Sequence, residues 1–484
     1  MRLLAGIVAA LSMIANGALA QPAPGSAPLR AEDVLASSAD HFPAILESLA
    51  NRRAAAGGVL EADGAFDLVF DAEYEDRVSG VWTGGYLNTG VRQNLRPLGA
   101  SVFGGYRVSE GEFPIYENEY FTNNAGEFKV GALFSLLRDR EIDQRRFRTT
   151  DARLAFQQAD LEVLLTKVGV QHKALSAYWR WVWAGLQLTV YEELLKIAEE
   201  RQAGLEEQVR VGARARIFLT ENLQNIWRRQ RLVTEARRDF LSAANALSFY
   251  YRNAVGEPVV PVEAQLPPIG ILQNIEDIAR TNGEDIPALL DRRPELAILK
   301  TGLERARQRV ALGRNDLQPR LDLSAEVSRD VGSVAEGGST FDSTDTIVGL
   351  RFSVPLQRRE AKGRLRRAEA ELEAIKQRRR QLEDQIEIDL RNIFITLNVA
   401  EQLVRIAGQE VDQAETMQTA EQERFASGAS DFFLVNVREE TAADARIRFY
   451  LAALETRIAR ANYDAASLNL ERLGLDEDHA NLDY

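Results

Sequence analysis

Cysteine is absent from this 484-residue sequence, and histidine occurs only three times, at His41, His172 and His479. Without cysteine the chain can form neither a disulfide framework nor a thiol for lipid attachment at the mature N-terminus. The histidines lie far apart in the sequence, so we expect no metal site and interpret His172 as a residue of a helix seam. The sequence also has no GxSxG, HExxH, Walker A or GxGxxG motif, so it offers no recognisable catalytic or cofactor-binding site.

Positively charged residues are fewer than negatively charged ones: the chain has 59 Lys and Arg residues and 72 Asp and Glu residues, which gives a net charge of −13. This balance disfavours nucleic acid as a partner. Long apolar runs are also scarce. Residues 1–20 combine a basic start, an apolar core and Ala18-Leu19-Ala20, which predicts an export signal cleaved before Gln21. No later run approaches the roughly 20 apolar residues of a membrane-spanning helix.

What the sequence does contain is a short alternating segment followed by a very long helical pattern. Val348, Leu350, Phe352 and Val354 share one face of a predicted strand. Apolar residues then recur at alternating steps of three and four through residues 358–426, which predicts a helical rod of roughly 100 Å at 1.5 Å per residue.

The same unit occurs in the first half of the chain. Residues 128–134 alternate like a strand, a helical seam follows, and Val211-Gly212 ends that rod as Ser427-Gly428 ends the second one. The offsets between the copies are nearly equal, which indicates an internal duplication. We therefore predict an export signal (1–20), a first repeat (21–255), a proline-rich connector (256–286), a second repeat (287–475) and an acidic tail (476–484).

Two further strands are predicted, and each carries acidic residues at alternate positions. These carboxylates are Asp67, Asp71, Glu73, Asp322 and Glu326. The alternation fits a water-soluble sandwich and a membrane barrel equally well. This gives four strands in all. Residues 78–127 are longer than their counterpart in the second half, and they form either a further hairpin from residues 86–95 and 100–108 or, as we expect, an exposed loop.

Several segments together resemble the TolC family of outer-membrane efflux proteins, also called outer-membrane factors. They are Arg293-Pro294-Glu295-Leu296, the stretch Leu317-Gln318-Pro319-Arg320-Leu321-Asp322-Leu323, the strand-to-helix passage after Val348, and the glycine turn that ends each rod. The resemblance covers nearly the whole mature chain.

The resemblance implies a mainly helical fold with a membrane β-barrel part. Long antiparallel helical hairpins would form an α-barrel, and each protomer of a homotrimer would give four strands to one shared barrel. The chain would be a passive channel of a tripartite efflux or type I secretion system, and not an enzyme, and it would need no cofactor. It would lie in the outer membrane of a Gram-negative bacterium, contact outer-membrane lipid, and bind a periplasmic adaptor and an inner-membrane transporter.

The family's functional positions carry over to three groups of residues. The adaptor-docking tips would be Val211, Gly212, Ala213, Ser427, Gly428 and Ala429. Members often place aspartates six and nine residues after the second tip glycine as a periplasmic constriction. Here those positions hold Leu434 and Val437, with Phe218 and Glu221 in the first half, so we expect an apolar constriction. The five strand carboxylates would line the barrel lumen and favour cations, or would be ordinary solvated residues.

Two other classes of protein remain open at this point. A periplasmic coiled-coil adaptor or scaffold would share the export signal, the acidic balance and the long helices, but it would not place strand pairs between long helices. A secreted hydrolase would need carboxylates in a catalytic setting, and none is recognisable. The sequence does not indicate the cargo.

Overall fold

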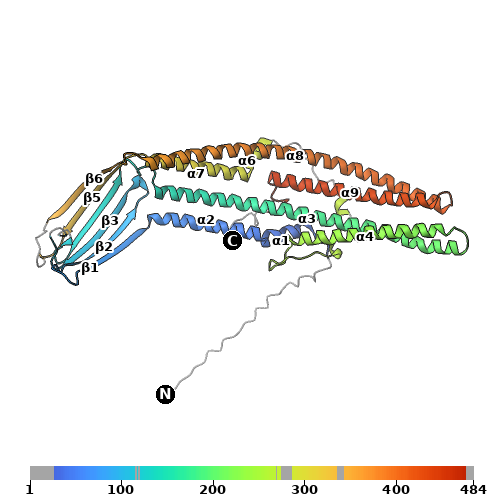
Figure 1. Ribbon diagram of the computed structural model, residues 1–484, viewed down its shortest axis with the longest axis horizontal. Coiled ribbons are helices and arrows are strands. Elements are labelled where there is room, and N and C mark those ends of the chain that lie inside the picture. Colours follow the sequence, from blue (N-terminus) through green and yellow to red (C-terminus); the bar gives the residue numbers. More distant parts are fainter. Residues whose placement is uncertain are drawn as a thin grey trace, which may run out of the picture.

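The computed structural model describes residues 27–114, 117, 120–268, 270–273, 286–334 and 343–475. The chain is elongated, with a sheet at one end and long helices side by side along the rest (Figure 1). The predicted export signal and acidic tail lie outside the described residues. No helix in the described ranges is long and apolar enough to cross a membrane.

Two helical hairpins form the body of the molecule. The helices are α1 (Ala31–His41), α2 (Pro43–Asp63), α3 (Gln144–Arg210), α4 (Ile217–Ser248), α5 (Gly270–Gln273), α6 (Ile286–Arg292), α7 (Pro294–Asp316), α8 (Arg359–Ala426) and α9 (Phe432–Ser467). The predicted rod over residues 358–426 is confirmed as α8. It packs against α9, as α3 packs against α4, and α2 and α7 run beside the starts of the two rods (Figure 1).

Local sequence explains where these helices begin. Pro43 and Pro294 occupy the first turns of α2 and α7, where a missing N–H costs nothing. The Asp143 carboxylate caps α3 by accepting a hydrogen bond of 2.8 Å from the Arg146 N–H. Asp431 caps α9 in the same way through the Leu434 N–H, also at 2.8 Å.

The main core lies between the two hairpins, at the middle of α3. Trp181 and Tyr178 are fully buried there, and the Trp181 ring stacks on Phe240 of α4. Trp181 therefore serves the packing of α3 against α4. His172 lies in the seam between α3 and α9, where its Nε2 is 2.5 Å from the Asn462 amide oxygen, as the sequence predicted.

The sheet has six antiparallel strands in sequence order rather than the predicted four. They are β1 (Leu68–Asp76), β2 (Gly85–Asn94), β3 (Ser101–Glu110), β4 (Glu127–Ser135), β5 (Arg320–Asp330) and β6 (Thr344–Ser353). The alternative of a further hairpin in residues 78–127 is the one observed, as β2 and β3. Both strands carry glycines, at positions 85, 90, 104 and 105, which weaken the apolar alternation by which strands are predicted.

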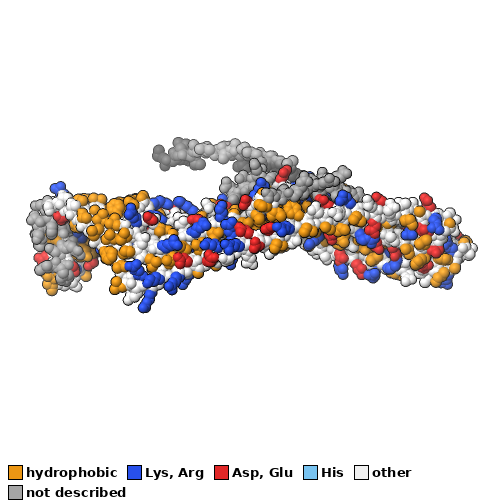
Figure 2. All heavy atoms as spheres, turned by 90° about the horizontal axis from the view of Figure 1, so that it is seen from above, with side chains coloured by type: hydrophobic (Ala, Val, Ile, Leu, Met, Phe, Trp, Pro, Cys, Tyr) orange, Lys and Arg blue, Asp and Glu red, His pale blue; other side chains and the backbone are white. Residues whose placement is uncertain are grey.

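The strand register divides the sheet into two unlike faces. Pairing places Phe70 beside Val91, and Val130 beside Val327, on one face. This apolar face consists of Leu68, Phe70, Tyr74, Leu87, Val91, Val102, Val108, Phe128, Val130, Phe134, Leu321, Leu323, Val327, Val348, Leu350 and Phe352. Many of these side chains are exposed, and hydrophobic side chains gather over the sheet end of the molecule in Figure 2. The opposite, polar face carries most charges of the strands, while Asp76, Glu110 and Arg329 lie on the apolar face.

Candidate functional site

The polar face of the sheet brings together the carboxylates expected to line a lumen. Asp71 and Glu73 of β1 share this face with Asp322 and Glu326 of β5, according to the register across the four intervening pairings. Asp67 lies directly before β1, at the end of a short 3-10 helix (Gly64–Phe66). The register thus puts Asp71, Glu73, Asp322 and Glu326 on one face of the sheet, whereas Asp67 has no partner in the strand register.

The same face also carries basic residues, which offset part of the negative charge. Its charged residues are Asp71, Glu73, Glu75, Arg92, Arg107, Glu127, Lys129, Arg320, Asp322, Glu326, Asp330, Asp345 and Arg351. Arg107 forms an ion pair of 2.6 Å with Glu127. Asp322 is buried and ion-paired with Arg320 at 2.6 Å, so its negative charge is largely neutralised. Carboxylates still outnumber cations, and the excess lies in the half of the sheet away from the helices.

Glycines on the polar face make room for long side chains to lie flat on the sheet. A Cβ at Gly90 would meet the Asp71 carboxylate at 3.0 Å, and one at Gly105 would meet the Lys129 side chain at 3.1 Å. The polar face is hollowed where it meets the helices, and this hollow has a volume of about 940 Å³. Gly90 and Gly105, which weaken the apolar alternation of β2 and β3, thus also shape this surface.

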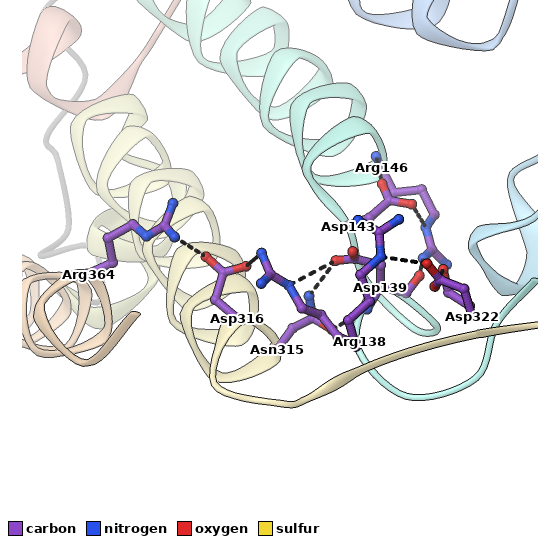
Figure 3. A network of polar contacts seen from close by, with 10 residues as sticks. Arg138, Asp139, Asp143, Arg146, Asn315, Asp316, Asp322 and Arg364 are labelled. Atoms are coloured by element: carbon purple, nitrogen blue, oxygen red, sulfur yellow. Dashed lines mark hydrogen bonds and ion pairs between the residues drawn. The ribbon is translucent and has the colours of Figure 1, made fainter. Parts of the chain in front are cut away.

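A polar network fastens the sheet to the helices at the edge of this hollow (Figure 3). Asp316, at the end of α7, accepts from Arg138 at 3.2 Å and from Arg364 of α8 at 3.3 Å. Asn315 donates to the Asp139 carboxylate at 2.9 Å and accepts from the Asp139 N–H at 2.8 Å. The network joins the β4–α3 connection to α7 and α8. No pattern in the sequence links positions 139 and 315, so only the structure could reveal it.

The predicted tip residues lie at the far end of the molecule from the sheet, in the turns α3–α4 and α8–α9 (Figure 1). Both turns are closed by an equivalent backbone hydrogen bond. Ala213 donates to the Gln208 carbonyl at 2.8 Å and Ala429 to the Arg424 carbonyl at 2.8 Å. Gly212 and Gly428 adopt φ of 75° and 77°, a left-handed conformation that favours glycine. Val211 is 60% exposed, so the tips offer a free surface in the single chain.

The predicted constriction residues lie just beyond the tips. Phe218 packs edge-on against Phe432 of the other hairpin, with ring centroids 6.1 Å apart. Leu434 is half-buried, Glu221 is half-buried, and Val437 is 37% exposed. Phe218 therefore contributes to an aromatic contact between hairpins, which the sequence analysis did not predict.

A buried ion cluster follows one turn further along α9. The Glu439 carboxylate is fully buried and lies 3.1 Å from the guanidinium of Arg229, which is 1% exposed. Arg201 of α3 also forms an ion pair with Glu439 and donates to Asn436 at 2.9 Å. Burial lowers the pKa of Arg229, which Glu439 partly offsets. The cluster links α3 and α4 to α9. The sequence did not predict it, because charged residues on a helix are usually exposed and nothing in their spacing indicates that they are buried together.

Known proteins resemble this chain in family and in fold. Residues 286–473 match the family model described as outer membrane efflux protein. Among solved structures, the MtrE outer membrane channel of Neisseria gonorrhoeae in its open state has a TM-score of 0.62 and 14% identity, covering 90% of this chain and 88% of that chain. The CmeC outer membrane channel of Campylobacter jejuni gives 0.61 and 13%, covering 92% and 89%. The outer membrane protein VceC of Vibrio cholerae gives 0.61 and 15%, covering 92% and 96%. Among curated proteins none matches this chain in sequence.

The fold, the hollowed polar face and the family match define an outer-membrane efflux channel. Such channels belong to the outer membrane of Gram-negative bacteria and transport solutes without catalysing a reaction. Residues 286–473 match the family of outer membrane efflux proteins, and the described chain has the fold of solved outer-membrane channels of the TolC type, as its sequence predicted. The alternative of a periplasmic adaptor or scaffold is thereby superseded.

Proposed function

We propose that three copies of this chain form one continuous channel, with a shared β-barrel of their sheets and an α-barrel of their helical hairpins. The observation that carries the proposal is the open sheet. Among the described strands, β1 and β6 each pair on one side only, and the apolar face of the sheet is exposed. An open edge is unfavourable in lipid because its N–H and C=O groups lack partners, so the edges must close on further copies. Trimers are the form that channels of this family adopt.

A second exposed apolar surface supports association along the helices. Ile388, Ile395, Val399, Leu403 and Ile406 of α8 are all exposed, and part of this stripe lines a groove of about 470 Å³ between α8 and α9. Helical apolar stripes of this length are normally covered in a folded protein. We propose that a neighbouring copy of this chain covers the stripe and fills the groove. The same copy would continue the α-barrel.

Native mass measurement of the mature protein tests the trimer. We expect the protein to require detergent for extraction from outer membranes and to have the mass of three chains. Release by osmotic shock as a monomer or dimer would contradict the shared barrel.

We further propose that the channel receives its cargo from an inner-membrane transporter through a periplasmic adaptor, in efflux or type I secretion. The tips Val211-Gly212-Ala213 and Ser427-Gly428-Ala429 would dock the adaptor. Their exposure and their identical turn geometry support this role, because the two tips then offer one repeated binding shape. The similar turns at the two tips also support the proposed division of the chain into two repeats. These are residues 21–255 and 287–475, with the connector 256–286 between them.

An apolar constriction at Leu434 and Val437, with Phe218 and Glu221 beside it, is proposed for the periplasmic entrance. Leu434→Asp should introduce three carboxylates there and make the channel sensitive to block by divalent cations. We expect single-channel conductance to fall on addition of millimolar divalent cation in the variant and not in the wild type. Unchanged conductance and unchanged sensitivity to cations would remove Leu434 from the constriction.

The barrel lumen is proposed to favour cations through Asp67, Asp71, Glu73 and Glu326, with Asp322 contributing less because Arg320 neutralises it. Three copies of each carboxylate would focus negative potential in a narrow polar space. Reversal potentials in a salt gradient should show cation preference, and Glu73→Gln should reduce it. Equal permeability of the wild-type channel to both ions would contradict the proposal.

A further inference from the structure

The hollow on the polar face has an electrostatic character opposite to that of the chain as a whole. Its basic lining residues are Arg92, Lys129, Arg138, Arg145, Arg320 and Arg364, whereas its acidic ones are Asp71, Asp139, Asp143 and Asp316. Cations therefore exceed carboxylates in this hollow, although the chain carries a net charge of −13. A local excess of positive charge in a concave space attracts anions, because the low-dielectric walls focus the potential.

Most carboxylates in the hollow are already engaged. Asp143 caps α3 and binds Arg146, with the two side chains 3.2 Å apart. Asp316 is shared by Arg138 and Arg364, and Asp139 is held by Asn315. These three acidic groups therefore have little capacity to neutralise other cations.

Three cations of the hollow have no such partner. In the described part of the chain, no carboxylate lies within 4.0 Å of a nitrogen of Arg92, Lys129 or Arg145. Asp71 is the acidic lining residue without an ion pair among the described residues, and it faces Lys129 along one row of the sheet, Asp71–Gly90–Gly105–Lys129. The first turn of α3, which includes Arg145, also opens onto the hollow, and the positive end of its helix dipole adds to the cationic character.

We propose that this hollow binds an anionic solute that carries at least two phosphate or carboxylate groups. Arg92 and Arg145 present guanidinium forks, which match the paired oxygens of such groups, and Lys129 supplies a third donor. Asn88, Asn94 and Ser101 line the same space and offer neutral hydrogen-bonding groups. The volume of about 940 Å³ accommodates a solute of metabolite or drug size.

The occupant is a free solute rather than a lipid headgroup, because the hollow lies on the polar face, opposite the apolar face of the sheet. Together with the acidic half of the same face, the hollow gives the inner surface of the sheet two zones of opposite charge. A solute with both charge signs would then find a complementary surface at each zone. Binding itself needs only one chain, whereas a role in transport rests on the proposed channel.

Calorimetric titration of the detergent-solubilised full-length protein with inorganic pyrophosphate tests the site. We expect saturable binding that weakens with added NaCl, and a loss of about tenfold or more in affinity in the double variant Arg92→Gln/Lys129→Gln. Asp71→Asn should tighten binding several-fold, because it removes the carboxylate that faces Lys129. The control is Arg378→Gln/Arg380→Gln, which removes the same charge from exposed positions of α8.

An equal loss of affinity in the α8 control, or no saturable binding by the wild type, would overturn the site. Weaker binding in Asp71→Asn than in the wild type would also contradict it. Titration with lipopolysaccharide in place of pyrophosphate should show no dependence on Arg92 and Lys129, and a dependence would reassign the hollow to a lipid headgroup. A conducting trimer without pyrophosphate binding would refute only this inference, whereas a monomer that binds pyrophosphate would refute only the channel.

Discussion

Replacing Glu439 with alanine is expected to loosen the end of α9 from α3 and α4. Glu439 is fully buried, and its removal leaves the guanidinium of Arg229, which is 1% exposed, with only the more distant Glu440 carboxylate at 3.9 Å. Breaking a buried ion pair from one side costs about 3–5 kcal/mol, since the remaining charge keeps its desolvation penalty. Hydrogen–deuterium exchange should therefore speed up by a factor of roughly 100 or more over residues 432–445, if local opening governs exchange there.

Two further variants test whether the effect comes from the unpaired buried charge or from any loss of an ion pair. Glu235→Ala removes the exposed ion pair with Arg231, at 2.8 Å, and should cost less than about 1 kcal/mol. Arg229→Met combined with Glu439→Leu removes both buried charges and should recover most of the lost protection. Equal exchange in Glu439→Ala and in the wild type would show that the cluster does not hold the hairpins together.

Val348→Arg is expected to prevent most of the protein from reaching its assembled state in the outer membrane. Val348 lies near the middle of β6, is 68% exposed and points to the apolar face of the sheet. An arginine on the lipid face of a membrane sheet costs about 2–4 kcal/mol near the bilayer midplane, and a trimer would carry three. The amount of trimer extracted from outer membranes measures the effect.

The adjacent residue supplies the control for this substitution. Ile347 is also apolar and 57% exposed, but it pairs with Glu326 on the polar face. Ile347→Arg should therefore assemble nearly as the wild type does, because the new charge meets water and a carboxylate. If both variants assembled equally well, the apolar face would not be the one that meets lipid.

The helical part of the fold was predictable because its signal is long and local. The seam of α8 recurs over many turns, and the glycines at 212 and 428 end both rods where the sequence predicted. The sheet was predictable only where apolar alternation is strong, as in β4 and β6. In β2 and β3 glycine replaces apolar side chains, and the stabilisation comes from pairing with neighbouring strands, which a local pattern does not record.

The candidate site was predictable in its placement but not in its electrostatics. Alternation correctly grouped Asp71, Glu73, Asp322 and Glu326 on one face. Which of these charges remain unpaired depends on neighbours in space, as the ion pair of Asp322 with Arg320 shows. The polar network between the sheet and the helices, and the ion cluster around Glu439, both join residues more than a hundred positions apart. No spacing in the sequence could therefore indicate either of them.

The open edges of β1 and β6 have a kinetic consequence for biogenesis. A chain that has folded its helices still exposes two rows of unpaired backbone groups until other copies arrive. Closure of the proposed trimer needs successive encounters, so its rate depends steeply on the local concentration of chains, and wrong encounters compete for the same edges. Overproduction should then favour aggregates unless a chaperone covers the edges, and the yield of channels should depend on how fast chains are delivered as well as on how stable the channel is.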